Sequence, residues 1–261
     1  MPPKRFLADI GNSRLKFARV DSHGEMALQT IVVTELPETW PQAIETLGGF
    51  ETGCVWGISS VRPEAAQRLA TLLDEAGVLS VRWFRSVADI PIRHALENPE
   101  SAGADRALAV LGFLAQTGIQ AGGVVVMCGT ALTVEQVSPD GCWQGGAIAP
   151  GWRPLAQALH VQAAQLPFIE QAGVGSGRGP GTNTQSAIQV GLQGMMVGGC
   201  RELVQTMRHG LPSSARTVWT GGDAGWLARA VDGEFARIET DLVFRGLLEA
   251  LGWSRVHGPR P

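Results

Sequence analysis

One arrangement of residues occurs twice in this sequence. The segment Ala8-Asp9-Ile10-Gly11-Asn12-Ser13 reads as a strand that ends in a glycine-polar turn and is followed by a hairpin turn at Gly24. The segment Val126-Met127-Cys128-Gly129-Thr130-Ala131 has the same order and is followed by a turn at Gly141. An internal duplication explains both, and so does the turn chemistry that ordinary hairpins share. Under the first interpretation the chain folds as two similar halves.

Strand-like and helix-like segments alternate along the chain, which is typical of an α/β fold. Pro63 in a first helical turn and Gly77 after a last one mark the two ends of one helix. The predicted strands are Phe6–Val20 (interrupted by its turn), Met26–Val33, Cys54–Ser60, Val81–Phe84, Val124–Cys128 and Thr217–Thr220. The predicted helices are Pro41–Leu47, Pro63–Ala76, Gly103–Ala115, Trp152–Ala164, Ala187–Arg208, Asp223–Val231 and Asp241–Leu251. We expect halves at residues 1–117 and 118–255, with a tail at 256–261.

Composition excludes several functional classes. A net charge of −3 argues against nucleic-acid coating and membrane-surface binding, both of which need a cationic field. No apolar run reaches the roughly 20 residues of a membrane span, and the first residues lack a signal-peptide pattern. The four cysteines are widely spaced, which indicates core thiols in a reducing compartment rather than a zinc site. We therefore expect a cytoplasmic protein.

The first candidate site is Asp9-x-Gly11-Asn12-Ser13-x-x-Lys16. A glycine in such a turn lets backbone N–H groups approach phosphate oxygens, and Asn12 and Ser13 add donors. An aspartate before the turn suits Mg²⁺, and Lys16 supplies a positive charge; Lys4 is the only other lysine. The alternative is a plain hairpin turn beside a solvated lysine.

Two further glycine motifs follow predicted strands. Gly129 and Thr130, with Thr133 close behind, again place a glycine and hydroxyls after a buried strand. Gly221 and Gly222 lie between a strand and a helix, where the backbone can approach a base or ribose. The alternatives are a good strand-forming threonine and an ordinary strand–helix loop.

Gly103-Ala104-Asp105-Arg106 begins a predicted helix. A carboxylate beside a guanidinium at a helix N-terminus suits activation of a hydroxyl and binding of an anion. The alternative is a helix-start acid with a surface ion pair. The glycine-rich stretch 173–179 is not a dinucleotide site, because no strand precedes it and Pro180-Gly181 prevents a helix directly after it. Neither lysine follows a glycine run of the P-loop type.

Taken in order, these motifs resemble the type III pantothenate kinases, which include the Bvg accessory factor proteins and belong to the acetate/sugar kinase–Hsp70–actin superfamily. The resemblance extends from Asp9 to Leu247. It rests on Asp9-Ile10-Gly11-Asn12-Ser13-Arg14-Leu15-Lys16, Ile58-Ser59-Ser60-Val61, Asn98-Pro99, Gly103-Ala104-Asp105-Arg106, Gly129-Thr130-Ala131-Leu132-Thr133, Gly145-Gly146-x-Ile148-x-Pro150-Gly151, Asn183-Thr184, Gly191, Thr220-Gly221-Gly222-Asp223 and Gly246-Leu247.

The resemblance implies two ribonuclease-H-like (actin-like ATPase) halves with mixed β-sheets, ATP in the cleft between them, and a homodimer. The implied reaction is ATP-dependent phosphorylation of pantothenate to 4'-phosphopantothenate, the first step of coenzyme A biosynthesis, with Mg²⁺ and a monovalent cation (K⁺ or NH4⁺). Asp105 would be the general base, and Arg106, with Gly103 and Ala104, would bind substrate. Thr184 would reach pantothenate from the neighbouring subunit. The remaining implied roles are Mg²⁺ at Asp9, phosphate at Asp9, Gly11, Asn12, Ser13, Lys16, Gly129, Thr130 and Thr133, adenosine at Gly221 and Gly222, and the monovalent cation at Glu135.

Three positions depart from the family pattern. Met127 stands where an aspartate is usual, so Mg²⁺ would depend mainly on Asp9. Glu135 replaces the usual cation-site aspartate, and Leu96 replaces a tyrosine. Besides an active pantothenate kinase, the sequence therefore allows a weakly active or non-catalytic regulatory protein on the same scaffold. Another sugar or acid kinase is a third possibility, although Gly-Ala-Asp-Arg is not the signature of those enzymes.

Overall fold

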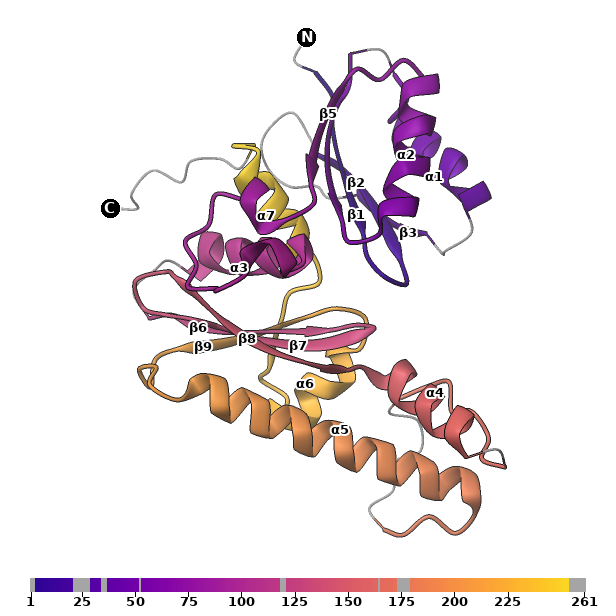
Figure 1. Ribbon diagram of the computed structural model, residues 1–261, viewed down its shortest axis with the longest axis vertical. Helices are drawn as coiled ribbons and strands as arrows, with labels where there is room; N and C mark the ends of the chain where they lie inside the picture. Colours follow the sequence, from indigo (N-terminus) through magenta and orange to yellow (C-terminus); the bar gives the residue numbers. More distant parts are fainter. Residues whose placement is uncertain are drawn as a thin grey trace. The chain divides into compact units, whose positions relative to one another are not determined.

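The computed structural model describes residues 3–20, 29–33, 37–51, 53–117, 121–163, 165–172 and 179–253. The expected turn at Gly24, most of the glycine-rich stretch and the tail at 256–261 lie outside these residues. The chain divides into two compact units (Figure 1). Unit 1 comprises Met1–Ile92, Glu97–Thr117 and Leu242–Pro261; unit 2 comprises Arg93–Leu96 and Gly118–Asp241.

Unit 1 is built on a five-stranded mixed sheet in the order β3-β2-β1-β4-β5. The first three strands form an antiparallel meander, and β4 and β5 continue from β1 in parallel. One face packs against α1 and α2 through a core that includes Phe6, Phe17 and Trp56. The elements are β1 (Arg5–Ile10), β2 (Leu15–Val20), β3 (Gln29–Val33), η1 (Pro37–Thr39), α1 (Trp40–Leu47), β4 (Val55–Ser60), α2 (Pro63–Glu75), β5 (Ser80–Phe84), η2 (Val87–Asp89), η3 (Pro99–Ser101), α3 (Ala104–Thr117) and α7 (Leu242–Ala250).

Helix α7 belongs to unit 1, although the division at 117 and 118 placed it in the second half. Its backbone lies against α3: a Cβ on Gly246 would lie 1.9 Å from the carbonyl oxygen of Leu108, and one on Gly112 would lie 2.2 Å from that of Leu242. Only glycine permits so close an approach of two helices. Because this packing joins segments far apart in the chain, a linear division of the sequence cannot show it.

Unit 2 repeats the topology of unit 1. Its sheet has the order β10-β9-β6-β7-β8, in which β6, β7 and β8 form the antiparallel meander and β9 and β10 extend from β6 in parallel. Strand β6 therefore corresponds to β1, and Met127 in β6 corresponds to Asp9 in β1. The elements are β6 (Gly123–Cys128), β7 (Ala131–Val137), β8 (Trp143–Pro150), α4 (Trp152–Gln162), α5 (Thr184–Arg208), β9 (Arg216–Thr220), α6 (Ala224–Asp232) and β10 (Arg237–Ile238).

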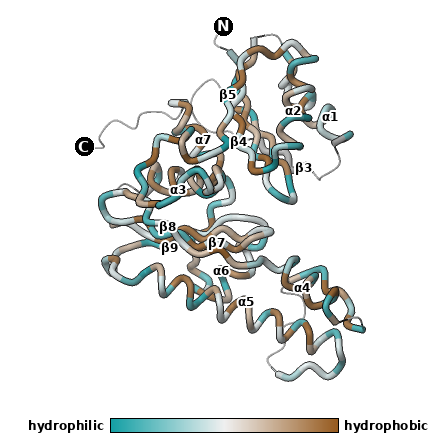
Figure 2. Tube along the Cα trace, viewed as in Figure 1, coloured by the Kyte–Doolittle hydropathy of each residue, from teal (hydrophilic) through white to brown (hydrophobic). Residues whose placement is uncertain are grey.

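The helices α4, α5 and α6 cover one face of this second sheet. The long helix α5 buries a residue at every fourth position, and apolar and polar residues alternate along it in Figure 2. Its buried residues are Ile188, Leu192, Met196, Cys200 and Val204. No helix among the described residues has both the length and the apolar character needed to span a membrane.

The shared topology of the two sheets confirms the predicted α/β fold with two similar mixed-sheet halves. Strand β8 was not predicted, because Gly145, Gly146 and Pro150 disfavour a strand on local propensity. Its pairing along the whole length of β7 outweighs that propensity.

Candidate functional site

The first glycine turn joins β1 to β2 in unit 1. The N–H of Gly11 donates to the carbonyl oxygen of Arg14 at 3.1 Å and closes the turn that carries Asn12 and Ser13. Asn12 is exposed and Ser13 is partly buried. Strand register places Asp9 opposite Lys16 on β2. The residues of the first predicted phosphate motif are therefore grouped at one end of this hairpin.

Asp9 is a buried carboxyl group, only 8% exposed. Burial raises the pKa of Asp9 from its ordinary 3.8 to about 6; Lys16 opposes this rise and Asp105 adds to it. Asp105 thus acts electrostatically on Asp9. Ser59 is the register partner of Asp9 on β4, and its fully buried hydroxyl has no hydrogen-bond partner. A buried acid beside an unsatisfied hydroxyl is the kind of polar group that functional sites retain.

Asp105 lies in the first turn of α3, as the motif predicted. Its Oδ1 accepts a hydrogen bond from the N–H of Arg106 at 2.9 Å. A Cβ on Gly103 would lie 2.5 Å from the same Oδ1, so glycine leaves room for this carboxylate. Asp105 and Arg106 are half-buried, while Ala104 is fully buried. The predicted general base therefore has a fixed position and remains accessible to solvent.

The second glycine turn joins β6 to β7 in unit 2. The N–H of Gly129 donates to the carbonyl oxygen of Ala131 at 3.1 Å, and the N–H of Gly151 donates to that of Thr130 at 2.9 Å. A Cβ on Gly151 would lie 2.0 Å from the Gly129 carbonyl oxygen. Thr133, 6% exposed, has a hydroxyl without a hydrogen-bond partner. The turn thus lies directly against the end of β8.

Gly221 and Gly222, the glycine pair after β9, lie beside the second glycine turn. Gly221 has a φ of +99°, and a Cβ there would lie 2.3 Å from the carbonyl oxygen of Cys128, the residue before Gly129. The N–H of Asp223 donates to that same carbonyl oxygen at 3.1 Å. Gly222 between them is exposed. The second phosphate motif and the predicted adenosine motif therefore meet where the parallel strands β6 and β9 end, a common ligand-binding position in α/β sheets.

Glu135 is a fully buried carboxyl group on β7. Its Oε2 accepts a hydrogen bond from the indole Nε1 of Trp143 at 3.0 Å, and a Cβ on Gly146 would lie 2.5 Å from the same oxygen. The predicted cation ligand is thus enclosed between β7 and β8. Sequence reasoning missed Trp143 as its partner, because no spacing rule relates an indole to a carboxylate across two strands.

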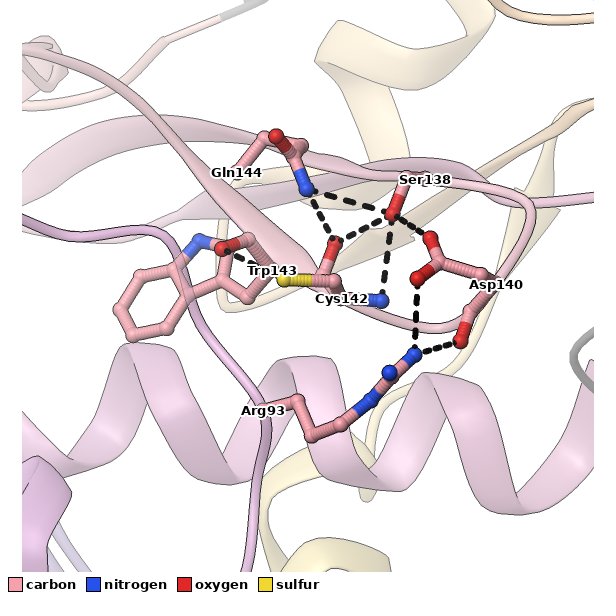
Figure 3. Close-up of polar contacts among 6 residues, drawn as sticks. All are labelled: Arg93, Ser138, Asp140, Cys142, Trp143 and Gln144. Atoms are coloured by element: carbon pink, nitrogen blue, oxygen red, sulfur yellow. Dashed lines mark hydrogen bonds and ion pairs between the residues drawn. The ribbon is translucent and has the colours of Figure 1, made fainter.

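The short segment Arg93–Leu96 packs on the start of β8 in unit 2. The N–H of Trp143 donates to the Arg93 carbonyl oxygen at 2.9 Å, and the N–H of Ala95 donates to the Trp143 carbonyl oxygen at 2.8 Å. The Arg93 guanidinium pairs with Asp140 at 2.9 Å in the turn before β8 (Figure 3). Leu96 fills the space beside Gly145, where a Cβ would lie 3.3 Å from its side chain.

Thr184 is exposed in the first turn of α5. Asn183 caps this helix, and its side chain accepts the N–H of Ser186 at 2.9 Å. The contacts of the glycine cluster around Gly129 do not include Thr184. The structure therefore places the predicted residues in four groups. These are Asp9 to Lys16 with Gly103 to Arg106, Gly129 and Thr130 with Gly221 and Gly222, Thr133 and Glu135 on β7, and Thr184 at the start of α5.

Comparisons with known proteins concern the family and the fold of the chain. The family model described as type III pantothenate kinase matches residues 5–206. A type III pantothenate kinase from Aromatoleum aromaticum is 30% identical over 244 residues, which cover 92% of this chain and 95% of that protein. A protein from Campylobacter jejuni described as a Baf family transcriptional activator has a TM-score of 0.57 at 20% identity, covering 95% of this chain and 97% of its own.

A second solved structure is also similar in fold. A protein from Sinorhizobium meliloti assigned as a 2-dehydro-3-deoxygalactonokinase has a TM-score of 0.62 at 14% identity, covering 94% of this chain and 97% of its own. The two solved structures therefore share the fold of this chain. With the family model covering most of the chain, this protein belongs to the type III pantothenate kinase family.

Proposed function

We propose that this protein transfers the γ-phosphoryl group of ATP to the primary hydroxyl of pantothenate and forms 4'-phosphopantothenate, the first intermediate toward coenzyme A. The observation that carries this proposal is a buried carboxyl group, Asp9, beside the first glycine turn, with the Asp105 carboxylate of the same unit near enough to help raise its pKa, in a chain of this family. Phosphoryl transfer depends mainly on positioning and charge neutralisation, so an acid beside a phosphate-binding turn is what the reaction requires.

Both glycine turns would hold the ATP phosphates. The first offers Gly11, Asn12 and Ser13 with the Lys16 charge, and the second offers Gly129 and Thr130 with the Thr133 hydroxyl. Gly221, whose backbone packs closely on Cys128, and the exposed Gly222 would contact the adenosine.

The residues at the first turn also fit Mg²⁺. Among the described residues, no group of three or more His, Cys, Asp or Glu side chains forms a metal cage. Mg²⁺ in kinases is typically held by one or two carboxylates together with substrate phosphates. Asp9, with the unsatisfied Ser59 hydroxyl at its side, suits that mode, whereas Met127 at the corresponding position in unit 2 cannot contribute. Bound there, Mg²⁺ would neutralise charge on the β- and γ-phosphates.

Asp105 would accept the proton of the pantothenate hydroxyl as that oxygen attacks the γ-phosphorus. The hydrogen bond that its Oδ1 accepts from the Arg106 N–H would hold the carboxylate in place for this proton transfer. The Arg106 guanidinium, with the backbone of Gly103 and Ala104, would bind the substrate or the transferring phosphoryl group. Such a base contributes typically 10²–10⁴-fold to the rate.

A monovalent cation, K⁺ or NH4⁺, would bind at Glu135. The fit rests on the buried carboxylate and on the Thr133 hydroxyl, which lies two residues earlier on the same face of β7 and has no hydrogen-bond partner. Oxygen donors of this kind suit hard cations. Exchange of KCl for NaCl should lower turnover, and the Glu135→Gln variant should lose that dependence.

A homodimer would place Thr184 of one subunit against the pantothenate of its partner. The side of α5 that faces away from the core carries Met195, 66% exposed, and Val190, 38% exposed. The small residues Gly191, Gly194 and Gly198 have open space around them and would let another helix approach. Sedimentation equilibrium should give a dimer, and Met195→Glu should weaken it.

The free thiols in the described residues suit a reducing cytoplasm.

The function is tested by measuring ADP release by the purified protein with Mg-ATP and a panel of alcohol acceptors. We expect release that depends on pantothenate and is faster in KCl than in NaCl. Preference for another acceptor would contradict the substrate assignment. Absence of turnover in both the wild type and Met127→Asp would favour the regulatory alternative, because the second carboxylate would then have been restored without effect.

A further inference from the structure

Arg62 is connected to the first glycine turn, although no sequence motif pointed to it. One guanidinium nitrogen, Nη1, donates to the carbonyl oxygen of Asn12 at 3.1 Å, across fifty positions of the chain. Arg62 lies two residues after the end of β4, the strand that runs parallel to β1, and the N–H of the intervening Val61 donates to the Ile10 carbonyl oxygen at 3.2 Å. The Arg62 guanidinium therefore lies against the glycine turn that follows β1.

The backbone of Arg62 is constrained by hydrogen bonds with the Ser60 hydroxyl and by the proline that follows it. The Ser60 hydroxyl accepts the Arg62 N–H at 3.1 Å and donates to the Arg62 carbonyl oxygen at 3.0 Å. Arg62 also precedes Pro63, which excludes helical geometry, and it has φ −126° and ψ 100°. Its side chain thus starts from a fixed position at the N-terminus of α2. A long side chain that starts from a fixed backbone loses less freedom when it forms one particular hydrogen bond.

The hydrogen bond acts on the peptide unit that joins Asn12 to Ser13. In a trans peptide the C=O of one residue and the N–H of the next lie in one plane and point in opposite directions. A donor fixed on the Asn12 carbonyl therefore also fixes the direction of the Ser13 N–H. That N–H belongs to the turn to which we assign phosphate binding. We propose that Arg62 is a positioning residue for the phosphate-binding turn: through the Asn12 carbonyl it orients the Ser13 amide for the nucleotide phosphates.

This inference rests on the proposed function for its ligand, but its test does not require pantothenate. Calorimetry on the full-length protein would compare ADP and adenosine binding to the wild type, Arg62→Met and Arg62→Lys. Arg68→Met is the matched control, since Arg68 is an exposed arginine on the same helix. We expect Arg62→Met to weaken ADP binding about 10-fold, in the range for a hydrogen bond to a charged group, and to leave adenosine binding unchanged. Arg62→Lys should recover part of the loss.

Three results would overturn the inference. One is an equal loss of adenosine and ADP binding, which would indicate general damage to the fold. Another is ADP binding by Arg62→Met that matches Arg68→Met. The third is a loss that disappears between about 0.05 M and 0.3 M salt, because simple charge attraction is screened over that range. In turnover assays the KM for ATP should rise while kcat stays close to the wild-type value. A wild type that binds ADP but does not phosphorylate pantothenate would contradict the proposed function and leave this inference supported by its own measurement.

Discussion

Replacing Asp9 by asparagine should stabilise the protein at neutral pH while it removes activity. The pKa of Asp9 is about 6 in the folded chain and 3.8 when the group is unperturbed. Between those values the folded state keeps a proton that the unfolded state has lost, so rising pH favours unfolding. Each pH unit corresponds to about 1.4 kcal/mol, so above pH 6 the charged Asp9 lowers the free energy of unfolding by about 3 kcal/mol. Asparagine stays neutral and avoids this penalty.

Urea unfolding of the wild type and Asp9→Asn between pH 4.5 and pH 8 measures the effect. At pH 4.5 the variant should be more stable by about 1 kcal/mol and at pH 8 by about 3 kcal/mol, following the same linkage relation. Asp74→Asn, which removes an exposed carboxylate from unit 1, is the matched control. A stability difference that is constant with pH would contradict the raised pKa of Asp9. An Asp9→Asn variant that retains Mg-ATP turnover would contradict the role of Asp9 in activity.

Three further predictions concern other parts of the molecule. Asp105→Asn should lower kcat by about 10²–10⁴-fold, as expected for loss of a general base, with ATP affinity retained in calorimetry; near-normal kcat would remove Asp105 from that role. Gly221→Ala should lower the free energy of unfolding by about 3 kcal/mol, because φ is positive at Gly221 and the added Cβ would clash with backbone atoms. The control is Gly225→Ala on α6, where the added Cβ has open space; it should be neutral or stabilising by up to about 1 kcal/mol. Gly246→Ala should lower it by about 1–3 kcal/mol, since the Cβ would lie 1.9 Å from the Leu108 oxygen; a thermal midpoint equal to the wild type would contradict the close α3–α7 packing.

Local signals in the sequence were sufficient for the glycine turns. Gly11 and Gly129 each follow an apolar run, and both do lie in turns between antiparallel strands, because that chemistry is local. The position of Asp105 in the first turn of a helix was predictable for the same reason. The roles proposed for these residues stay predictions until they are measured.

Contacts between distant segments were not predictable. The fit of Gly246 against Leu108 and the hydrogen bond from Arg62 to Asn12 depend on segments that the sequence keeps apart. Glycine at position 246 serves a close approach of helices, and nothing in its local sequence distinguishes it from a helix-breaking residue. Trp143 is similar, since its role as donor to Glu135 follows from the register of β8, which local propensity did not favour.

A crystal structure of the protein with Mg²⁺, a non-hydrolysable ATP analogue and pantothenate would test the proposed phosphoryl transfer. We expect phosphates bound by both the turn at Gly11–Ser13 and the turn at Gly129–Thr130. We also expect the pantothenate hydroxyl within about 3 Å of an Asp105 carboxylate oxygen, the reach of a general base. A nucleotide held by only one of the two turns, or an acceptor hydroxyl beyond the reach of Asp105, would contradict the proposed transfer.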